Sequence, residues 1–370
     1  MKFVDLERQY QVLEHEIRGR IDAVMNHGRF IMGPEVGELE ERLSEFCGVR
    51  HTIGVANGTD AISLALMALE IGPGDAVFVP TFTFFATAEA VSLIGATPVF
   101  VDIDETTYNI DPAGVDAAIR AIAEAGELTP RAIIAVDLFG LPANYTELVK
   151  VAARHSVFLI EDAAQGLGGA LHGKRSCSFG DVATTSFFPA KPLGCFGDGG
   201  AVFTSDDELA DRLRSLRVHG QGRHKYDNVM IGMNSRLDTI QAAVLLAKLT
   251  IFDSELEARQ SNADALGARL GPGFITPSVA GGYRSAWAQY SLRPATEDRD
   301  AVLARLGARD IPTAIYYAQP LHLAAAYKSL GYGVGDFPVS ERVAGDVFSV
   351  PVHPYLDDND LDRIAEALES

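Results

Sequence analysis

Hydrophobic residues in the first 250 positions of the chain fall into short blocks that alternate with stretches of helical spacing. Five blocks are rich in Val, Ile and Phe and are bounded by Gly, Pro or polar residues, which is typical of strands covered on both faces. These predicted strands cover residues 76–80, 98–104, 132–140, 157–165 and 182–188. Because helical patterns separate most of them, we expect an α/β fold with a mostly parallel sheet.

Two early helices are predicted from apolar spacing. The first begins at Pro34, a residue suited to a helix start, and its apolar positions are Val36, Leu39, Leu43 and Phe46. The second covers residues 61–71 and follows a polar loop at 56–60. Ligands of such folds bind beyond the carboxyl ends of the strands, so the polar residues just after each predicted strand are candidates for chemistry.

The pattern changes near residue 250. A predicted helix over 251–270 leads into a stretch that contains Gly and Pro, and the apolar segment 288–294 follows. Two further helices are predicted, at 298–308 and at the end of the chain. With 370 residues the chain is long enough for two domains. We therefore expect a large α/β domain over residues 1–250 and a smaller α+β domain over residues 251–370.

Composition excludes several classes of partner. The net charge of −19 repels nucleic acids and anionic membranes, both of which need clustered Lys and Arg. No apolar run approaches the ~20 residues that span a bilayer, and the first residues lack the apolar core of a signal peptide. Three sparse cysteines, at no metal-ligand spacing, favour a reducing compartment. We expect a cytoplasmic protein without a metal site.

Lys191 lies in an irregular loop between Pro residues and Gly-rich sequence, just beyond a predicted strand. Alone, it is more often a solvated loop lysine than a catalytic one. Asp162 ends another apolar run, where a carboxylate is costly unless it is paired or hydrogen-bonded. It either caps a helix or keeps a pyridine nitrogen protonated, so that the ring accepts electrons.

An anion site is indicated at Gly58 and Thr59, immediately before a predicted helix, where backbone N–H groups and the helix dipole favour negative charge. An ordinary helix cap is the alternative. Ser186, shortly before Lys191, can add a hydroxyl donor. Phe84 follows an earlier strand and belongs either to the core or to a ring that stacks on a planar cofactor.

The order of these signals resembles that of fold-type I pyridoxal-phosphate enzymes, and the chain resembles the DegT/DnrJ/EryC1/StrS family of sugar aminotransferases. The motifs that carry this are FIMGPEV (30–36), ANGTDA (56–61), PTFTFFATAEA (80–90), EDAAQ (161–165), SFFPAKPLGCFGDGGA (186–201), GMNSRLDTIQAA (232–243), YYAQPLH (316–322) and SVPVHPYL (349–356). Residues 174–201 are most similar to aminotransferases acting on UDP-2-acetamido-2-deoxy-3-oxo-glucuronate. The resemblance implies a large seven-stranded sheet and pyridoxal 5′-phosphate as cofactor.

The resemblance also implies roles for individual residues. Lys191 would bind the cofactor covalently and then carry a proton, and Asp162 would pair with the pyridine nitrogen. The remaining cofactor contacts would be Gln165 at the phenolic oxygen, Phe84 on the ring face, Gly58, Thr59 and Ser186 at the phosphate, and Asn234, which reaches the phosphate from a neighbouring subunit. The active unit would then be a homodimer with shared sites.

Substrate contacts are expected from three segments. Arg236 would enter from the same partner loop, and His219 begins a basic cluster with Arg223, His224 and Lys225 that suits a diphosphate or carboxylate. Tyr316, Tyr317 and His322 match a family segment that lines the sugar pocket, although many members have His in place of Tyr316 and Pro in place of Ala318. The implied reaction moves an amino group from glutamate to a nucleotide-linked keto-sugar, for a surface polysaccharide, lipopolysaccharide or other glycolipid.

Three alternatives stay open. The substrate could be a 4-keto sugar linked to dTDP, UDP or GDP, or a cyclitol. A dehydratase would carry His in place of the lysine, so Lys191 argues against it. A non-enzymatic regulator that senses the cofactor would keep only the fold.

Overall fold

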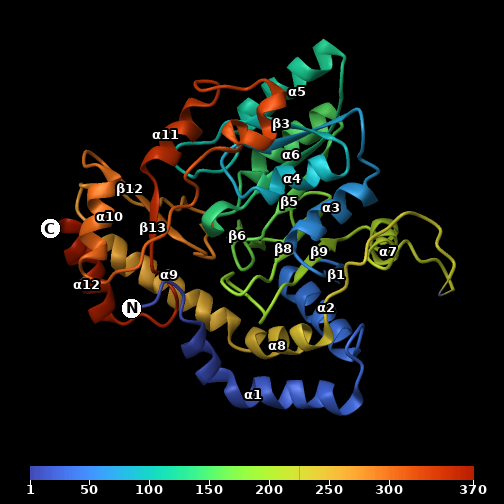
Figure 1. Cartoon of the computed structure of the whole chain (residues 1–370), viewed down its shortest axis with the longest axis horizontal. Helices are drawn as coiled ribbons and strands as arrows, with labels where there is room; N and C mark the ends of the chain where they lie inside the picture. Colours follow the sequence, from blue (N-terminus) through green and yellow to red (C-terminus); the bar gives the residue numbers. More distant parts are fainter. Residues whose placement is uncertain (225) are drawn as a thin grey trace.

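The computed structural model describes residues 1–224 and 226–370. Its centre is a seven-stranded sheet with the strand order β1-β9-β8-β5-β4-β2-β3 (Figure 1). The strands are β1 (His51–Val55), β2 (Asp75–Pro80), β3 (Thr97–Val101), β4 (Thr129–Val136), β5 (Phe158–Asp162), β8 (Val182–Ser186) and β9 (Gly200–Thr204). Pairing is parallel from β8 through β5, β4 and β2 to β3, whereas β9 runs antiparallel to both β1 and β8.

Helices cover both faces of this sheet. Successive residues of a strand point to opposite faces of the sheet, so Val77 of β2 packs against one layer of helices and Phe78 against the other. One face carries α3 (Gly58–Ala68), α4 (Ala86–Leu93) and α7 (Asp207–Leu216). The other carries α2 (Pro34–Cys47), α5 (Pro112–Ala125), α6 (Tyr145–His155) and α8 (Thr239–Leu249).

The carboxyl ends of β1, β2, β3, β4, β5 and β8 lie along one edge of the sheet, because β9 is the single reversed strand among the seven. Every loop that follows these strands therefore opens on the same side. β9 begins at this edge, so the loop between β8 and β9 leaves and returns there. This geometry gathers residues that are more than a hundred positions apart in the sequence.

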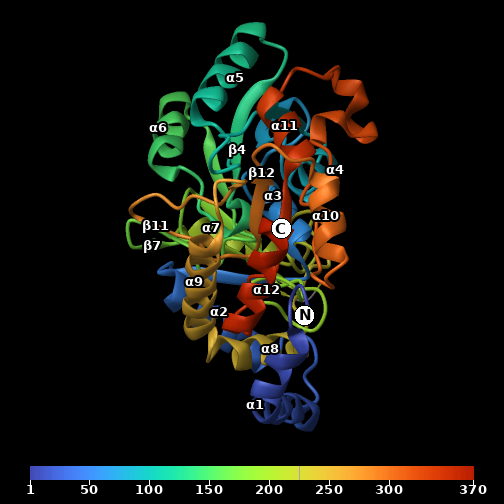
Figure 2. The same cartoon turned by 90° about the vertical axis from the view of Figure 1, so that its left-hand side faces the viewer.

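A second, antiparallel sheet is formed by β10 (Phe274–Ile275), β12 (Tyr290–Pro294) and β13 (Phe348–Val350). Its core is shared with α9 (Phe252–Arg269), α10 (Arg299–Gly307) and α12 (Asp358–Glu369), and it lies to one side of the large sheet, near both chain ends (Figures 1 and 2). A third small sheet joins β11 (Tyr283–Arg284) to β6 (Ala170–Leu171) and β7 (Lys174–Arg175). The remaining elements are α1 (Leu6–His27), α11 (Pro338–Asp346) and the short 3₁₀ segments η1 (Leu138–Gly140), η2 (Leu321–Leu323) and η3 (Ala325–Leu330).

The α/β fold and the mostly parallel seven-stranded sheet are confirmed, and all five predicted strands exist. Four of them end earlier than the apolar runs indicate: β3 ends at Val101, β4 at Val136, β5 at Asp162 and β8 at Ser186. Several residues beyond these ends are still buried in loops at the sheet edge, so burial alone does not mark a strand end. The pattern gave no strand at β1 or β9 and no helix at α1. The domain boundary at 250 falls between α8 and α9 and stays a prediction.

Helix boundaries follow capping chemistry. Pro34 occupies the first position of α2, and Gly48 ends that helix in the left-handed region at φ 72°. Among the described residues, no helix is both long and apolar enough to cross a membrane.

Candidate active site

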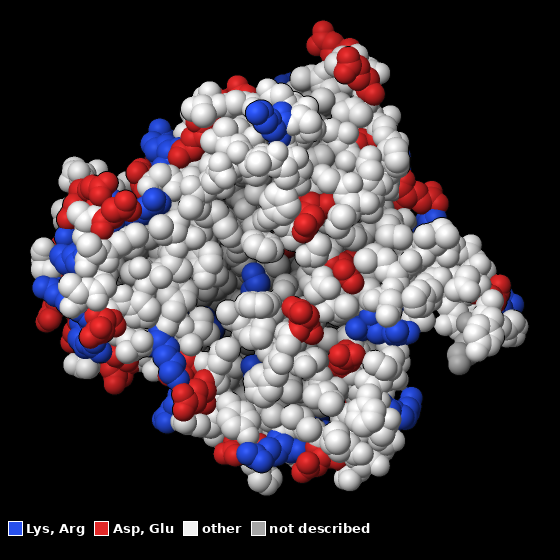
Figure 3. Space-filling model, in the orientation of Figure 1, with Lys and Arg blue, Asp and Glu red and all other residues white. Residues whose placement is uncertain are grey.

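A cavity of about 670 Å³ opens at the carboxyl edge of the large sheet. Figure 3 shows the corresponding face as hollowed near its centre, with basic atoms inside and acidic groups on the rim. Loops after β1, β2, β5 and β8 line it together with residues of the C-terminal part. The lining residues are Asn57, Gly58, Thr59, Asp60, Ile62, Thr83, Phe84, Ala86, Thr87, Val136, Asp162, Ala164, Gln165, Ser186, Phe188, Ala190, Lys191, Asp198, Gln289, Tyr316 and Tyr317.

The N-terminus of α3 forms one part of the wall. The side chain of Asn57 accepts a hydrogen bond from the amide of Asp60 at 2.8 Å and so caps the helix. This cap leaves the amides of Gly58 and Thr59 in the first turn, which has no intrahelical acceptors for them. Gly58 also packs tightly on β8, since a Cβ at this position would lie 2.8 Å from the Cβ of Ser186. Only glycine lets the helix start and Ser186 approach so closely.

Asp162 ends β5 and is buried, with 4% of its surface exposed. Its Oδ2 accepts a hydrogen bond from Thr87 Oγ1 at 2.9 Å, and its Oδ1 accepts one from the amide of Ala164 at 3.2 Å. Burial raises the pKa of this carboxyl, against these two hydrogen bonds and the positive charge of Lys191. A cation placed beside Asp162 would stabilise its ionised form.

Lys191 lies half-buried in the loop between β8 and β9 and lines the same cavity as Asp162. Its amide donates to the carbonyl of Phe188 at 2.9 Å. Farther along the loop, Lys248 of α8 donates to the carbonyl of Gly194 at 2.6 Å. Burial lowers the pKa of Lys191, against the negative charge of Asp162. The loop thus holds an amine that gives up its proton more readily than a solvated lysine.

Gln165 and Tyr317 join the two parts of the chain across the cavity. Gln165 Oε1 accepts from the amide of Phe139 at 2.6 Å, and its Nε2 donates to the hydroxyl of Tyr317 at 3.0 Å. The ring of Phe84, 57% exposed, lies 6.1 Å from that of Tyr317. An exposed phenylalanine in a cavity wall leaves a free apolar face for a planar ligand.

Two buried carboxyls lie directly behind this wall. Asp137, after β4, accepts hydrogen bonds from Tyr145, Ser176 and the amide of Ala143 at 2.7 to 3.0 Å, and its amide donates to the carbonyl of Asp162 at 3.0 Å. Glu161, the residue before Asp162, is fully buried beside Asp137. Burial and the nearby charge of Asp137 raise the pKa of Glu161 well above its usual range.

Among the cavity residues that were not predicted from the sequence, three have polar side chains that bear on the chemistry. Thr87 is the second residue of α4, and its bond to Asp162 spans 75 positions and has no local signal. Asp198 belongs to the Gly-rich run after Lys191, where an acid next to glycines could have been noted. Gln289 stands beside β12, and its buried Oε1 has no hydrogen-bond partner among the described residues.

Three predicted residues lie outside the cavity of the single chain. Asn234 and His219 are exposed, and Arg236 is half-exposed with its guanidinium bonded to Asn234. They lie close together, because the amide of His219 donates to the carbonyl of Met233 at 2.8 Å. Of the basic cluster around His219, Lys225 lies outside the described residues.

His322 also lies outside the cavity, contrary to the prediction that it lines the sugar pocket with Tyr316 and Tyr317. Only 1% of its surface is exposed, and both ring nitrogens have protein partners. The two tyrosines do line the cavity. The motif YYAQPLH thus contains two residues that line the cavity and one that is buried behind it.

The lining fits the phosphorylated pyridine that the resemblance implies. The first turn of α3 and Ser186 offer donors to a phosphate, and the glycine at 58 leaves room that a Cβ would fill. Asp162 is buried, and Lys191 is the only cation beside it among the described residues that line the cavity. Its carboxylate therefore suits a protonated ring nitrogen. Lys191 provides an amine of lowered pKa for covalent attachment.

Comparison with known proteins identifies the family. Residues 11–369 match the DegT/DnrJ/EryC1/StrS aminotransferase family. The chain is 46% identical to UDP-2-acetamido-2-deoxy-3-oxo-D-glucuronate aminotransferase of Pseudomonas aeruginosa, with 100% of this chain and 99% of that protein covered.

Solved structures agree. A DegT DnrJ EryC1 StrS aminotransferase from Brucella abortus is 51% identical with a TM-score of 0.97, covering 100% of this chain and 98% of that one. DesV of S. venezuelae, in complex with a ketimine intermediate, is 40% identical with a TM-score of 0.94, covering 99% and 97%. Further similar structures are in pyridoxal- or pyridoxamine-phosphate form. The chain belongs to the DegT/DnrJ/EryC1/StrS aminotransferase family and is a sugar aminotransferase that depends on pyridoxal 5′-phosphate.

Proposed function

We propose that this enzyme transfers an amino group from glutamate to a nucleotide-linked keto-sugar, of the UDP-2-acetamido-3-keto type. The observation that carries the chemistry is the placement of Lys191, Asp162 and the start of α3 around one cavity. The choice of sugar is supported by the 46% identity to the P. aeruginosa enzyme over nearly its whole length. A surface polysaccharide or glycolipid as the end product, and the cytoplasm as the location, remain predictions from the sequence.

The reaction has two halves, in which glutamate gives up its amino group and the keto-sugar then receives it. When bound, the cofactor supplies an electron sink for charge that develops beside the transferred nitrogen. Asp162, oriented by Thr87, would keep that sink effective by placing its negative charge against the ring nitrogen. Gly58, Thr59 and Ser186 would hold the phosphate, while Gln165 and Phe84 would orient the ring.

Lys191 acts twice. Its amine would hold the cofactor covalently in the resting enzyme, and as a free amine it would move a proton to and from the substrate carbon. A proton carrier works best when its pKa lies near the operating pH. The burial that lowers the pKa of Lys191 supports both tasks.

We further propose that the active enzyme is a homodimer whose sites are completed by the partner. The proposed substrates carry phosphates and carboxylates, yet Lys191 is the only Lys, Arg or His among the described residues that line the cavity. Further cations must therefore come from elsewhere, and Arg236 and His219 lie on an exposed loop. Exposed apolar side chains nearby in the fold offer a surface for a second copy, and they include Phe30, Ile31, Phe188, Val229 and Ile231.

An absorbance scan tests the role of Lys191. With pyridoxal phosphate the protein should show a band in the visible range, and Lys191→Ala should abolish both the band and turnover. Lys150→Ala, at an exposed lysine of α6, is the matched control and should keep both. If Lys191→Ala keeps band and turnover, the proposal fails. A band without turnover on any keto-sugar would favour a cofactor-sensing regulator.

A thermal-shift panel tests the substrate. Amino-sugars linked to UDP, dTDP or GDP and a free amino-cyclitol are the reaction products under the competing substrate choices. A ligand that binds the folded state raises the melting temperature by mass action, so the UDP-linked 3-amino sugar should give the largest shift. Equal shifts for all three nucleotides, or a larger one for a dTDP- or GDP-linked 4-amino sugar or the cyclitol, would contradict the UDP choice.

A further inference from the structure

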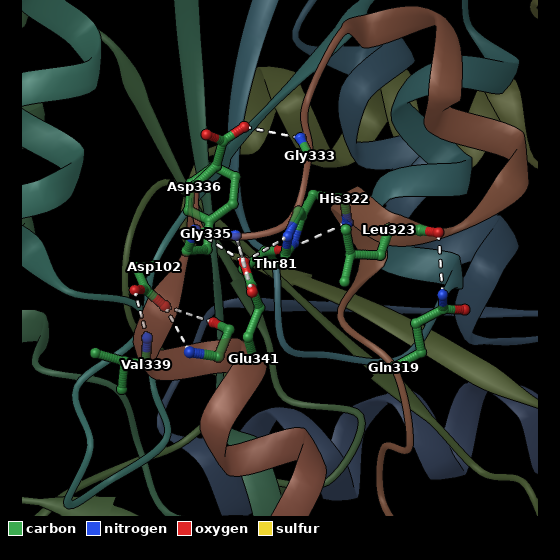
Figure 4. Close-up of polar contacts among 12 residues, drawn as sticks. Thr81, Asp102, Gln319, His322, Leu323, Gly333, Gly335, Asp336, Val339 and Glu341 are labelled. Carbon is green, nitrogen blue, oxygen red and sulfur yellow. Dashed lines mark hydrogen bonds and ion pairs between the residues drawn. The ribbon is translucent and has the colours of Figure 1, made fainter.

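Residues 314–341, which we call the strap, cross the carboxyl edge of the large sheet. The strap begins beside the second sheet, where Ala314 pairs with Ser349, and it ends in α11. Its first residues include Tyr316 and Tyr317, which line the cavity. The rest of the strap has no described contact with the cavity, yet it is held to the large sheet by several buried polar contacts (Figure 4).

The strongest of these contacts joins His322 to the residue that follows β2. Thr81 is fully buried, and its Oγ1 lies 2.7 Å from Nδ1 of His322. The same Oγ1 accepts the amide of His322 at 3.2 Å, and the carbonyl of Thr81 accepts the amide of Leu321 at 2.7 Å. Three hydrogen bonds thus fix one turn of the strap to the end of β2.

The other ring nitrogen of His322 faces α11. Its Nε2 lies 3.2 Å from Oε1 of Glu341, and Glu341 in turn accepts the amide of Gly335 at 2.9 Å (Figure 4). Asp102, after β3, accepts the amides of Val339 and Ser340 at 3.0 and 2.9 Å and so caps the start of α11. His322 therefore links the end of β2 to α11 through the two nitrogens of its ring.

This arrangement excludes a direct role for His322 at the substrate. The ring is 1% exposed, and it packs against Phe337 with ring centres 4.7 Å apart. To reach the cavity, the imidazole would have to give up its hydrogen bonds to Glu341 and to the fully buried hydroxyl of Thr81, and leaving a buried polar group unsatisfied costs about 1–3 kcal/mol. Both nitrogens are already used for structure.

The contact reaches the cavity through neighbours on both sides. On the sheet side, Thr81 is followed by Phe82, Thr83 and Phe84, of which the last two line the cavity. On the strap side, the ring of Tyr317 lies 6.1 Å from the rings of Phe82 and Phe84. A shift of the strap along β2 would therefore move Tyr317 relative to Phe84.

We propose that His322 is a positioning residue that fixes the Tyr316–Tyr317 wall over the cavity by bonding Thr81 and Glu341. The inference rests on the proposed function, in which this wall contacts the keto-sugar. It replaces the direct sugar contact that the motif alone suggests. Loss of the imidazole loosens the wall and weakens sugar binding, while the proposed cofactor contacts at Lys191, Asp162 and the start of α3 lie on other loops and are unaffected.

Steady-state kinetics with the keto-sugar tests this on four proteins: wild type, His322→Asn, Thr81→Val and the double variant. For His322→Asn we expect KM to rise about 10-fold with kcat within about 2-fold, because binding is lost without loss of chemistry. Cofactor affinity should stay unchanged. The KM of the double variant should be little higher than that of His322→Asn, since both changes break the same contact between His322 and Thr81. His172→Asn, at an exposed histidine, is the control for the substitution itself.

Other results overturn the proposal. If the KM increases of the two single variants multiply in the double variant, His322 and Thr81 act separately, as they would if His322 bound the sugar directly. A fall in kcat at unchanged KM, or no change, would also contradict it. Thr81→Val, a milder change, decides the case if His322→Asn does not fold: it must raise KM by itself.

Hydrogen exchange of the cofactor-free protein separates this proposal from the proposed function. In both variants, amides of residues 314–323 should exchange about 10-fold faster, whereas those of β5 should not change. This readout needs no substrate. Faster exchange in an enzyme that aminates no nucleotide sugar would refute the function and leave the strap contact standing. Unchanged exchange would refute the strap contact whatever the activity.

Discussion

Two walls of the cavity are built in different ways. The strand-end wall consists of loops directly after β1, β2, β5 and β8, and it carries Gly58, Thr87, Asp162 and Lys191. The C-terminal wall consists of Gln289, Tyr316 and Tyr317, from segments that connect to the second sheet. The first wall has dense hydrogen bonds around fixed strands, whereas the second depends on contacts such as those of Gln165 and His322. Under the proposed function, the sheet edge would carry the chemistry and the C-terminal segments would contact the sugar.

The largest expected effect is at the strand-end wall. Asp162→Ala should lower kcat by about 10²–10⁴-fold, the range for losing a group that supports proton transfer. Thr87→Val, which removes one hydrogen bond to Asp162, should cost about 10-fold. Single-turnover rates with glutamate measure both. If Asp162→Ala were no worse than Thr87→Val, the carboxylate would not be the main support of the chemistry.

A smaller effect is expected for removing Arg236, which we propose as a cation that the partner subunit adds to the cavity. Arg236→Ala should raise KM for the nucleotide sugar about 10- to 100-fold, because a charge-assisted hydrogen bond to an anion contributes ~1.5–3 kcal/mol. Mixing this variant with Lys191→Ala chains should restore part of the activity, since one site in each mixed dimer then has both residues intact. No recovery after confirmed subunit exchange would show that Arg236 does not act across the interface.

At the C-terminal wall, Gln289→Leu tests the unpaired buried oxygen. Loss of one neutral hydrogen bond to substrate should raise KM by roughly 3- to 10-fold and leave the cofactor band unchanged. Gln319→Leu, at an exposed glutamine of the strap, serves as the control. A gain in melting temperature with no change in KM would assign Gln289 to the protein interior rather than to the substrate.

The smallest expected effect concerns the buried carboxyl pair behind the strand-end wall. The pKa of Glu161 is raised in the folded protein, so its contribution to stability is full below the ordinary value of 4.5 and is lost as pH rises through the folded value. Glu161→Gln cannot ionise, so its melting temperature should fall less than that of the wild type between pH 5 and 8, by roughly a few °C. Glu147→Gln, at an exposed carboxylate, should follow the wild type. Parallel curves for Glu161→Gln and wild type would contradict this.

The two walls also differ in how far the sequence predicts them. Lys191, Asp162 and Gly58 could be picked out because each follows a recognisable strand or precedes a helix, and parallel strands bring such positions to one edge. Thr87 has its partner far away in sequence, and the side-chain oxygen of Gln289 has none among the described residues, so no local pattern marks them. His322 was predicted to line the cavity but lies behind its wall, because adjacency to Tyr317 in a motif does not say which way a side chain points.

The single reversed strand also matters for how the enzyme could be altered. Because β9 returns beside β8, the loop that carries Lys191 and Asp198 is closed by two paired strands rather than by a crossover helix. Residues 187–199 could therefore be exchanged for the equivalent loop of a relative that keeps apolar residues at Phe187, Leu193 and Cys195, which pack in the core against α2 and α8. A grafted loop would also have to keep two described contacts with α8: Lys248 donates to the carbonyl of Gly194 at 2.6 Å, and the side chain of Gln241 accepts the amide of Phe196 at 2.8 Å. With these contacts kept, the loop that carries Lys191 could be exchanged as one hairpin.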